Sequence, residues 1–187
     1  MIQNSLRNPM PNIPLSNIDY GPEEEQAALR VLNSRWLTMG EETQAFEAEF
    51  ASALNVKDAV AVTNGTAALH LAMLACGIGP GDGIIQPAVN FISAANMTLA
   101  VGATPIFADI NSLGEPTISP ESIEKLLSSS HPPTTNNKSP ITVRPKAVLV
   151  MHYGGFPCRM SEIQAICEEH GLLLIEDACH GIGATTQ

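Results

Sequence analysis

The sequence predicts an α/β protein whose mostly parallel sheet is covered by helices on both faces, in three layers. From residue 58 onward, short apolar stretches alternate with amphipathic ones, which is the pattern of strands joined by helical crossovers. Strands at the centre of such a sheet are apolar throughout because both of their faces are buried. The predicted strands are 59–63, 83–86, 104–109, 146–151 and 172–176, and the predicted crossover helices are 66–76, 92–101, 120–127 and 159–170.

Length and composition favour one domain or slightly more with a packed core. The chain has 187 residues, of which 44% are hydrophobic and 15% charged, and this balance argues against general disorder. Nine Lys and Arg against 19 Asp and Glu give a net charge of −10, which disfavours binding to nucleic acid or anionic lipid. The sequence shows neither a membrane-span pattern nor a signal-peptide pattern, so we expect no membrane partner and a cytoplasmic location.

Residues 1–57 are expected to precede the sheet as an arm and two helices. The first 19 residues contain three prolines and no sustained period, which is typical of an extended arm. The first helix is predicted to begin at Pro22, a favoured first-turn residue, and to end near Asn33. The second helix carries a single apolar stripe formed by Phe46, Phe50 and Leu54.

Residues 58–187 are expected to form the sheet domain, interrupted by a polar insertion at 128–145 that is rich in Ser, Thr, Asn and Pro. The cysteines form no Cys-x-x-Cys pair, so we interpret them as thiols without disulfides. A zinc site can be drawn from four residues, but no pair of them has the spacing of a structural zinc site. These four are His152, Cys158, Cys179 and His180.

The carboxyl ends of the strands are the places where a parallel sheet gathers ligands. The turn Asn64-Gly65-Thr66 lies between a predicted strand and a predicted helix, where free N–H groups and the helix dipole favour an anion. Asp177 ends an apolar run and precedes His180 by three residues, a pair suited to acid–base work, a metal, or the nitrogen of a heterocycle. Phe91 follows the second strand, where its ring can cover a planar ligand or simply pack.

The glycines of CGIGPGDG, residues 76–83, do not form a dinucleotide fingerprint. They follow a helix and precede a strand, which is the reverse of the order that this motif requires. We interpret them as a helix C-cap and a reverse turn.

Several ordered blocks of the chain resemble the DegT-type sugar aminotransferases, which are pyridoxal phosphate (PLP) enzymes of fold type I. The match runs from about Ile13 to residue 187 through WLTMGEETQAFEAEFA, TNGTAALHLAMLACGIGPGD, GATPIFADI, VLVMHYGGFPCRMSEI and LLLIEDACHGIGA. The resemblance implies the large domain of fold type I, truncated, with the small C-terminal domain absent.

The resemblance also implies a cofactor site for PLP, and the spacing argument above leads us to expect no metal. In the family, the turn that matches Asn64-Gly65-Thr66 holds the cofactor phosphate, and the aromatic residue that matches Phe91 stacks on the pyridine ring. The aspartate that matches Asp177 pairs with the ring nitrogen, and the residue that matches His180 contacts the phenolic oxygen. The expected catalytic residues are therefore Asp177 and His180, and the expected cofactor-binding residues are Gly65, Thr66, Ala67, Phe91, Asp177 and His180.

The lysine that binds the cofactor in this family lies beyond the position of Asp177, in a part that this chain does not contain. The lysines here, Lys57, Lys125, Lys138 and Lys146, do not fall at the carboxyl ends of predicted strands. We therefore expect the chain to be inactive alone and the full-length form to be a homodimer.

By this resemblance the enzyme transfers an amino group from an amino acid, such as glutamate, to a keto-sugar nucleotide in polysaccharide or amino-sugar biosynthesis. The alternatives are a PLP-dependent sugar dehydratase of the same family, a non-catalytic remnant or dimerising fragment, and an unrelated nucleotide-binding α/β domain. The strand order of the family places the neighbours of strand 59–63 after residue 187. We therefore expect this strand either to lie apart from the other four or to be held only by the packing of its helices.

Overall fold

The computed structural model describes residues 18–128 and 143–185. The chain divides into two compact units between Ala59 and Val60. The described part of the first unit holds helices α1 (Pro22–Ser34) and α2 (Glu41–Ala53). The start of α1 confirms the prediction at Pro22, and its first turn is stabilised because the Gly21 N–H donates to the Glu24 carboxylate at 2.7 Å.

The second unit is built on a parallel sheet in the order β2-β1-β3-β4. The strands are β1 (Asp82–Pro87), β2 (Thr104–Ala108), β3 (Arg144–Met151) and β4 (Leu173–Asp177), and each neighbouring pair runs parallel. This arrangement confirms the predicted α/β class. All carboxyl ends consequently meet at one edge of the sheet.

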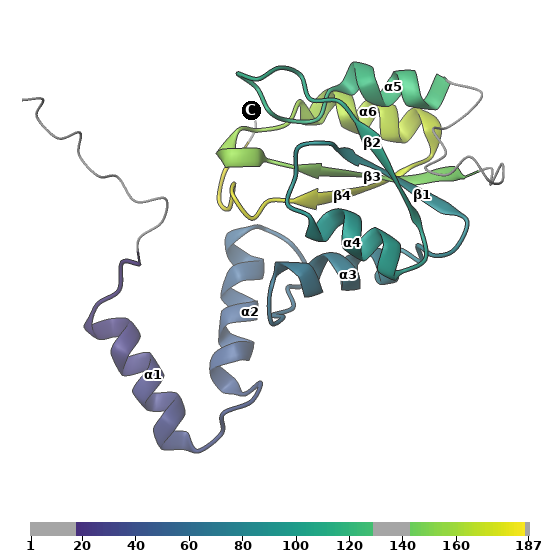
Figure 1. Cartoon of the computed structure of the whole chain (residues 1–187). Coiled ribbons are helices and arrows are strands. Elements are labelled where there is room, and N and C mark those ends of the chain that lie inside the picture. Colours follow the sequence, from purple (N-terminus) through teal and green to yellow (C-terminus); the bar gives the residue numbers. More distant parts are fainter. Residues whose placement is uncertain (1–17, 129–142, 186–187) are drawn as a thin grey trace, which may run out of the picture. The chain divides into compact units, whose positions relative to one another are not determined.

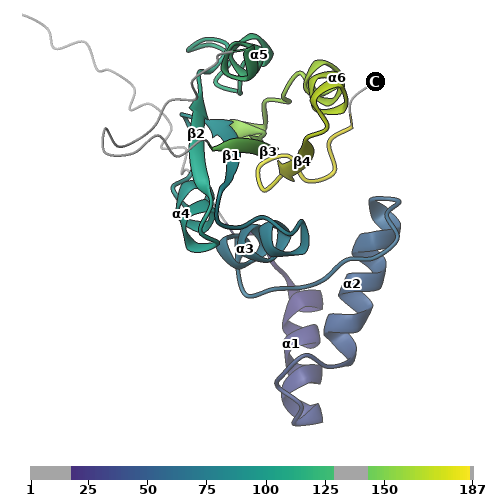
Figure 2. The same ribbon diagram turned by 90° about the vertical axis from the view of Figure 1, so that its right-hand side faces the viewer.

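Two pairs of helices cover the sheet, one pair on each face (Figures 1 and 2). Helices α3 (Gly65–Ala75) and α4 (Ser93–Ala100) pack on one face, where Met73 and Ile84 are fully buried. Helices α5 (Pro120–Ser128) and α6 (Met160–His170) pack on the other, where Ile123 and Ile163 are fully buried. Burial of one such side chain contributes about 1.5–3 kcal/mol, so both interfaces stabilise the layers.

Residues 59–63 do not form the predicted strand. None of them belongs to a strand, and Val60 and Val62 are 74% and 37% exposed. An apolar segment becomes a strand only where a neighbouring strand bonds to its backbone, and no described strand pairs with this segment. The segment lies outside the sheet, as the strand order of the resembled family implies.

The polar insertion predicted at 128–145 ends earlier in the structure than we expected. Arg144 and Pro145 belong to β3, because they pair with Asp82 and Gly83 of β1. Residues 129–142 of the predicted insertion lie outside the described residues.

The CGIGPGDG segment forms a helix end and a turn, as predicted. Gly77 and Gly81 have φ of 64° and 91°, a left-handed conformation that glycine adopts at little cost. Lys146 binds the Gly77 carbonyl and the Asp82 carboxylate from the start of β3. This lysine therefore fastens the amino end of the sheet, opposite to the edge where the strands end.

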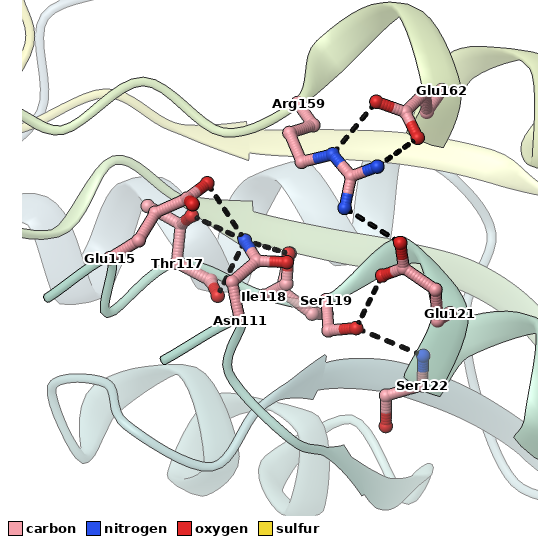
Figure 3. A network of polar contacts seen from close by, with 9 residues as sticks. All are labelled: Asn111, Glu115, Thr117, Ile118, Ser119, Glu121, Ser122, Arg159 and Glu162. Atoms are coloured by element: carbon pink, nitrogen blue, oxygen red, sulfur yellow. Dashed lines mark hydrogen bonds and ion pairs between the residues drawn. The ribbon is translucent and has the colours of Figure 1, made fainter. Parts of the chain in front are cut away.

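A polar network joins the start of α5 to the start of α6 (Figure 3). The Arg159 guanidinium donates to Glu121 at 2.7 Å and to both carboxylate oxygens of Glu162. Ser119 donates its hydroxyl to Glu121 and accepts the Ser122 N–H. One arginine thus links the two helices that cover the same face of the sheet.

Candidate functional site

A cavity of about 480 Å³ lies at the carboxyl edge of the sheet. Four separate segments line it: the start of α3, the residues between β1 and α4, the end of β3, and the end of β4 with the residues that follow it. The lining residues are Asn64, Gly65, Thr66, Leu69, Asn90, Phe91, Ser93, Met151, Tyr153, Asp177, Cys179 and His180. A volume of this size suits a small-molecule ligand.

The N-terminus of α3 offers donors to this cavity. The Asn64 side chain caps the helix by accepting the Ala67 N–H at 2.9 Å. The N–H groups of Gly65 and Thr66 form no hydrogen bond within the described chain, and both residues line the cavity. Free amides at the positive end of a helix dipole favour an anionic ligand.

Asp177 is the last residue of β4 and lies half-buried in the cavity wall. Its Oδ1 accepts the Cys179 N–H at 3.2 Å. The pairing of Met151 with Asp177 sets this position, since both residues end adjacent strands. A carboxylate held in this way can accept a hydrogen bond from a ligand.

His180 is oriented by the turn that follows β3. The Gly154 N–H donates to His180 Nδ1 at 3.1 Å, so in the neutral imidazole the proton lies on Nε2. The Tyr153 ring meets the His180 ring edge-on, with centroids 6.1 Å apart. Gly154 and Gly155 have φ of 65° and 84°, which explains why glycines form this turn. His180 can therefore donate from Nε2 to a ligand oxygen.

Phe91 is 63% exposed and presents its ring at the cavity. Its N–H donates to the Asn90 side-chain oxygen at 2.7 Å. Asn90 Nδ2 is buried and has no hydrogen-bond partner in the described part of the chain. A flat ligand can lie against the Phe91 ring.

Five of the six sequence-predicted site residues line this one cavity: Gly65, Thr66, Phe91, Asp177 and His180. Ala67 does not line it, and its N–H is occupied by Asn64. The residues that the sequence argument missed include Asn90, Ser93, Met151, Tyr153 and Cys179. Only their position in the sequence could have identified these residues, since they lie at or beyond the carboxyl end of a strand.

None of the described lysines lines this cavity. Lys57 is near Asp58, Lys125 lies in α5, and Lys146 lies at the amino end of the sheet. Lys138 falls outside the described residues. Within residues 18–128 and 143–185, no group of three or more His, Cys, Asp or Glu side chains is arranged to hold a metal ion. Within the same ranges, every helix is too short or too polar to cross a membrane.

A second cavity of about 500 Å³ runs along the C-terminal half of α2 and the residues after it, from Glu47 to Ala59. It contains neither a helix N-terminus nor a strand end. We therefore assign the candidate site to the cavity at the sheet edge.

Comparison with known proteins gives close relatives in sequence. The spore coat polysaccharide biosynthesis protein SpsC of Bacillus subtilis (strain 168) is 42% identical over 175 residues, which are 92% of this chain and 41% of SpsC. This chain thus spans about two fifths of the length of that relative.

Solved structures share the fold at similar coverage. The structure of S. venezuelae DesV in complex with a ketimine intermediate is 35% identical, with a TM-score of 0.73 over 85% of this chain and 39% of DesV. The E. coli GDP-4-keto-6-deoxy-D-mannose-3-dehydratase with bound hydrated PLP is 27% identical, with a TM-score of 0.78 over 94% of this chain and 43% of the dehydratase.

A family model matches residues 19–187, which is nearly the whole chain. That match includes every residue of the cavity at the sheet edge. The chain therefore belongs to the DegT/DnrJ/EryC1/StrS aminotransferase family.

Proposed function

We propose that the cavity at the sheet edge binds PLP and that the protein is an aminotransferase. The observation that carries this proposal is the convergence of one helix start and three strand-end segments on one cavity that presents an anion-binding helix end, an aromatic ring, a carboxylate and an imidazole. Each of these groups has a counterpart in PLP, which carries a phosphate, a flat ring, a ring nitrogen and a phenolic oxygen.

The Gly65 and Thr66 N–H groups would hold the phosphate, since both are free at the N-terminus of α3. In the resembled family the matching turn also uses the position of Ala67, but here Asn64 already accepts that amide, so we propose no phosphate contact for Ala67. The Thr66 hydroxyl adds a further donor. The phosphate would thus be recognised mainly through backbone groups.

Asp177 and His180 would act on the ring of the cofactor. Asp177 Oδ2 would accept a hydrogen bond from the protonated ring nitrogen, and its negative charge would keep the proton there. His180 would donate from Nε2 to the phenolic oxygen, because Gly154 occupies Nδ1. When bound, PLP withdraws electrons from the carbon that loses a proton during amino transfer.

For the substrate we propose a keto-sugar nucleotide, with an amino acid such as glutamate as the donor, in polysaccharide or amino-sugar biosynthesis. The polysaccharide role of SpsC supports this assignment. We further propose that the protein acts as a homodimer in the cytoplasm. A PLP-dependent sugar dehydratase is the second candidate, because the E. coli dehydratase matches 94% of this chain.

The experiment is a calorimetric titration of the protein with PLP. We expect saturable binding, and we expect Asp177→Asn to raise the Kd about tenfold or more, the factor that corresponds to one charge-assisted hydrogen bond. Asp109→Asn is the matched control, because Asp109 follows the end of β2 at the same sheet edge but does not line the cavity. Equal losses in both variants, or no binding by the wild type, would contradict the proposal.

Mass spectrometry of the products separates the two reactions. An aminotransferase incubated with a keto-sugar nucleotide and glutamate gives a sugar with an amino group in place of the keto oxygen. A dehydratase gives a sugar that has lost a hydroxyl group and gained no nitrogen.

A further inference from the structure

His152 is a buried histidine that the proposed function does not use. It lies just beyond the end of β3 and is 8% exposed. The Cys158 N–H donates to its Nδ1 at 3.0 Å, so in the neutral ring the proton lies on Nε2. That nitrogen lies 2.9 Å from Glu176 Oε1. Both ring nitrogens therefore have partners.

These two partners belong to the two segments that carry Tyr153 and His180 to the cavity. Cys158 closes the turn that begins at Tyr153, and Glu176 directly precedes Asp177. The backbone of His152 also takes part, because its N–H donates to the Asp177 carbonyl at 3.2 Å. One residue thus connects the end of β3 to the end of β4.

The hydrogen bond between His152 and Glu176 affects how the Asp177 side chain is oriented. Successive side chains of a strand point to opposite faces, so holding Glu176 on one face limits rotation of the strand end that carries Asp177 on the other. The bond from the Cys158 N–H to His152 holds the turn that contains Gly154. The Gly154 N–H in turn donates to His180 Nδ1, which makes Nδ1 the acceptor nitrogen of that ring. Both ends of the candidate site therefore depend on His152.

We propose that His152 is a positioning residue: through Cys158 and Glu176 it holds the turn 153–158 and the end of β4 so that Asp177 and the Nε2–H of His180 face the same ligand. The significance for catalysis rests on the proposed function. The geometric part can be tested without any cofactor.

The test combines imidazole nitrogen NMR with PLP titration on four variants. His152→Gln keeps a polar group near Nε2, His152→Asn keeps an acceptor near Nδ1, and Glu176→Ala removes the acceptor that Nε2 faces. His170→Gln is the control, because His170 is exposed at the end of α6. The spectra are recorded at a pH at which histidine is neutral, and they report which ring nitrogen carries the proton.

In the wild type we expect both His152 and His180 to carry the proton on Nε2. In the His152 variants and in Glu176→Ala we expect His180 to lose this preference and the Kd for PLP to rise about tenfold, as for the loss of one hydrogen bond. His170→Gln is expected to change neither value. Loss of stability alone would not redistribute the His180 proton in molecules that remain folded.

A proton on His152 Nδ1 in the wild type, or an unchanged His180 in the folded variants, would overturn the proposal. If His152→Gln and His152→Asn do not fold, Glu176→Ala decides, because the Glu176 side chain is 48% exposed and can be removed without leaving a buried charge. If the wild type does not bind PLP, the proposed function fails, while the His180 measurement still decides the role of His152.

Discussion

At the scale of single residues, the Asp177 carboxylate influences its neighbours as well as a ligand. Its Oδ1 accepts the Cys179 N–H, so the carboxylate lies close to the cysteine thiol. Partial burial of that thiol, and next the Asp177 carboxylate, raise the pKa of Cys179 to about 11. A residue that is exposed as a whole therefore has a thiol that is almost entirely protonated at neutral pH.

We predict that Asp177→Asn makes Cys179 react several-fold faster with iodoacetamide at neutral pH. Removal of the negative charge lowers the pKa of Cys179 and increases the fraction of thiolate, which is the reactive form. The increase should be partial, because burial of the thiol persists. Peptide mass spectrometry over a time course measures the rate.

Asp109→Asn should leave the rate at Cys179 unchanged, because Asp109 does not line the cavity. An unchanged rate in Asp177→Asn would show that the carboxylate does not act on this thiol.

At the scale of elements, α5 and α6 are joined by an exposed arginine network as well as by the core beneath them. Its member Glu121 accepts from its own backbone N–H, from Arg159 and from Ser119, and these bonds lower the pKa of Glu121 from 4.5 to about 2. Exposed ion pairs contribute little because water and salt screen them. The network is therefore expected to align the two helix starts more than to stabilise the fold.

We predict a small acid sensitivity that depends on Glu121. Its folded-state pKa lies below the unfolded value, so its contribution to the free energy of unfolding is present above pH 4.5 and is lost as the pH falls toward 2. Urea unfolding across this pH window should show a shallower pH dependence for Glu121→Gln than for the wild type. Arg159→Met should reduce the slope in the same direction.

Glu124→Gln in the same helix serves as the control and should leave the slope as in the wild type. Identical slopes for the wild type and Glu121→Gln would contradict the role given to this network.

At the scale of the whole molecule, apolar surface remains outside the core. Val60 and Val62 are exposed, and β4 pairs only with β3 among the described strands, with Leu173 40% exposed on it. An edge strand with exposed apolar neighbours pairs readily with other chains. The described residues thus leave both an apolar segment and a sheet edge open to association.

We predict that the 187-residue chain associates with itself in a concentration-dependent manner in sedimentation velocity experiments. Changing both Val60 and Val62 to Lys should weaken this association, because charged side chains oppose pairing of apolar segments. Val56→Lys is the control, because Val56 is also exposed but lies in the first unit. A monodisperse monomer with a sharp two-state melt would contradict the prediction.

The sequence by itself determined the α/β class, the order of helices and strands after residue 82, and the strand ends at which chemistry was to be sought. These features are local, because apolar periodicity, caps and turn residues lie within a few positions of one another. Asp177 could be identified in this way, since a carboxylate directly after an apolar strand stands out in the sequence.

Only the tertiary structure decided which bonding partners the segments and side chains with these local patterns have. Residues 59–63 have the composition of a strand but belong to no described strand, and the Ala67 amide is occupied by Asn64. The sequence suggests for His152 only membership of a zinc set without suitable spacing, whereas the fold places its ring between Cys158 and Glu176. The two partners of the His152 ring lie 6 and 24 residues away in the chain, and no local pattern encodes that they meet there.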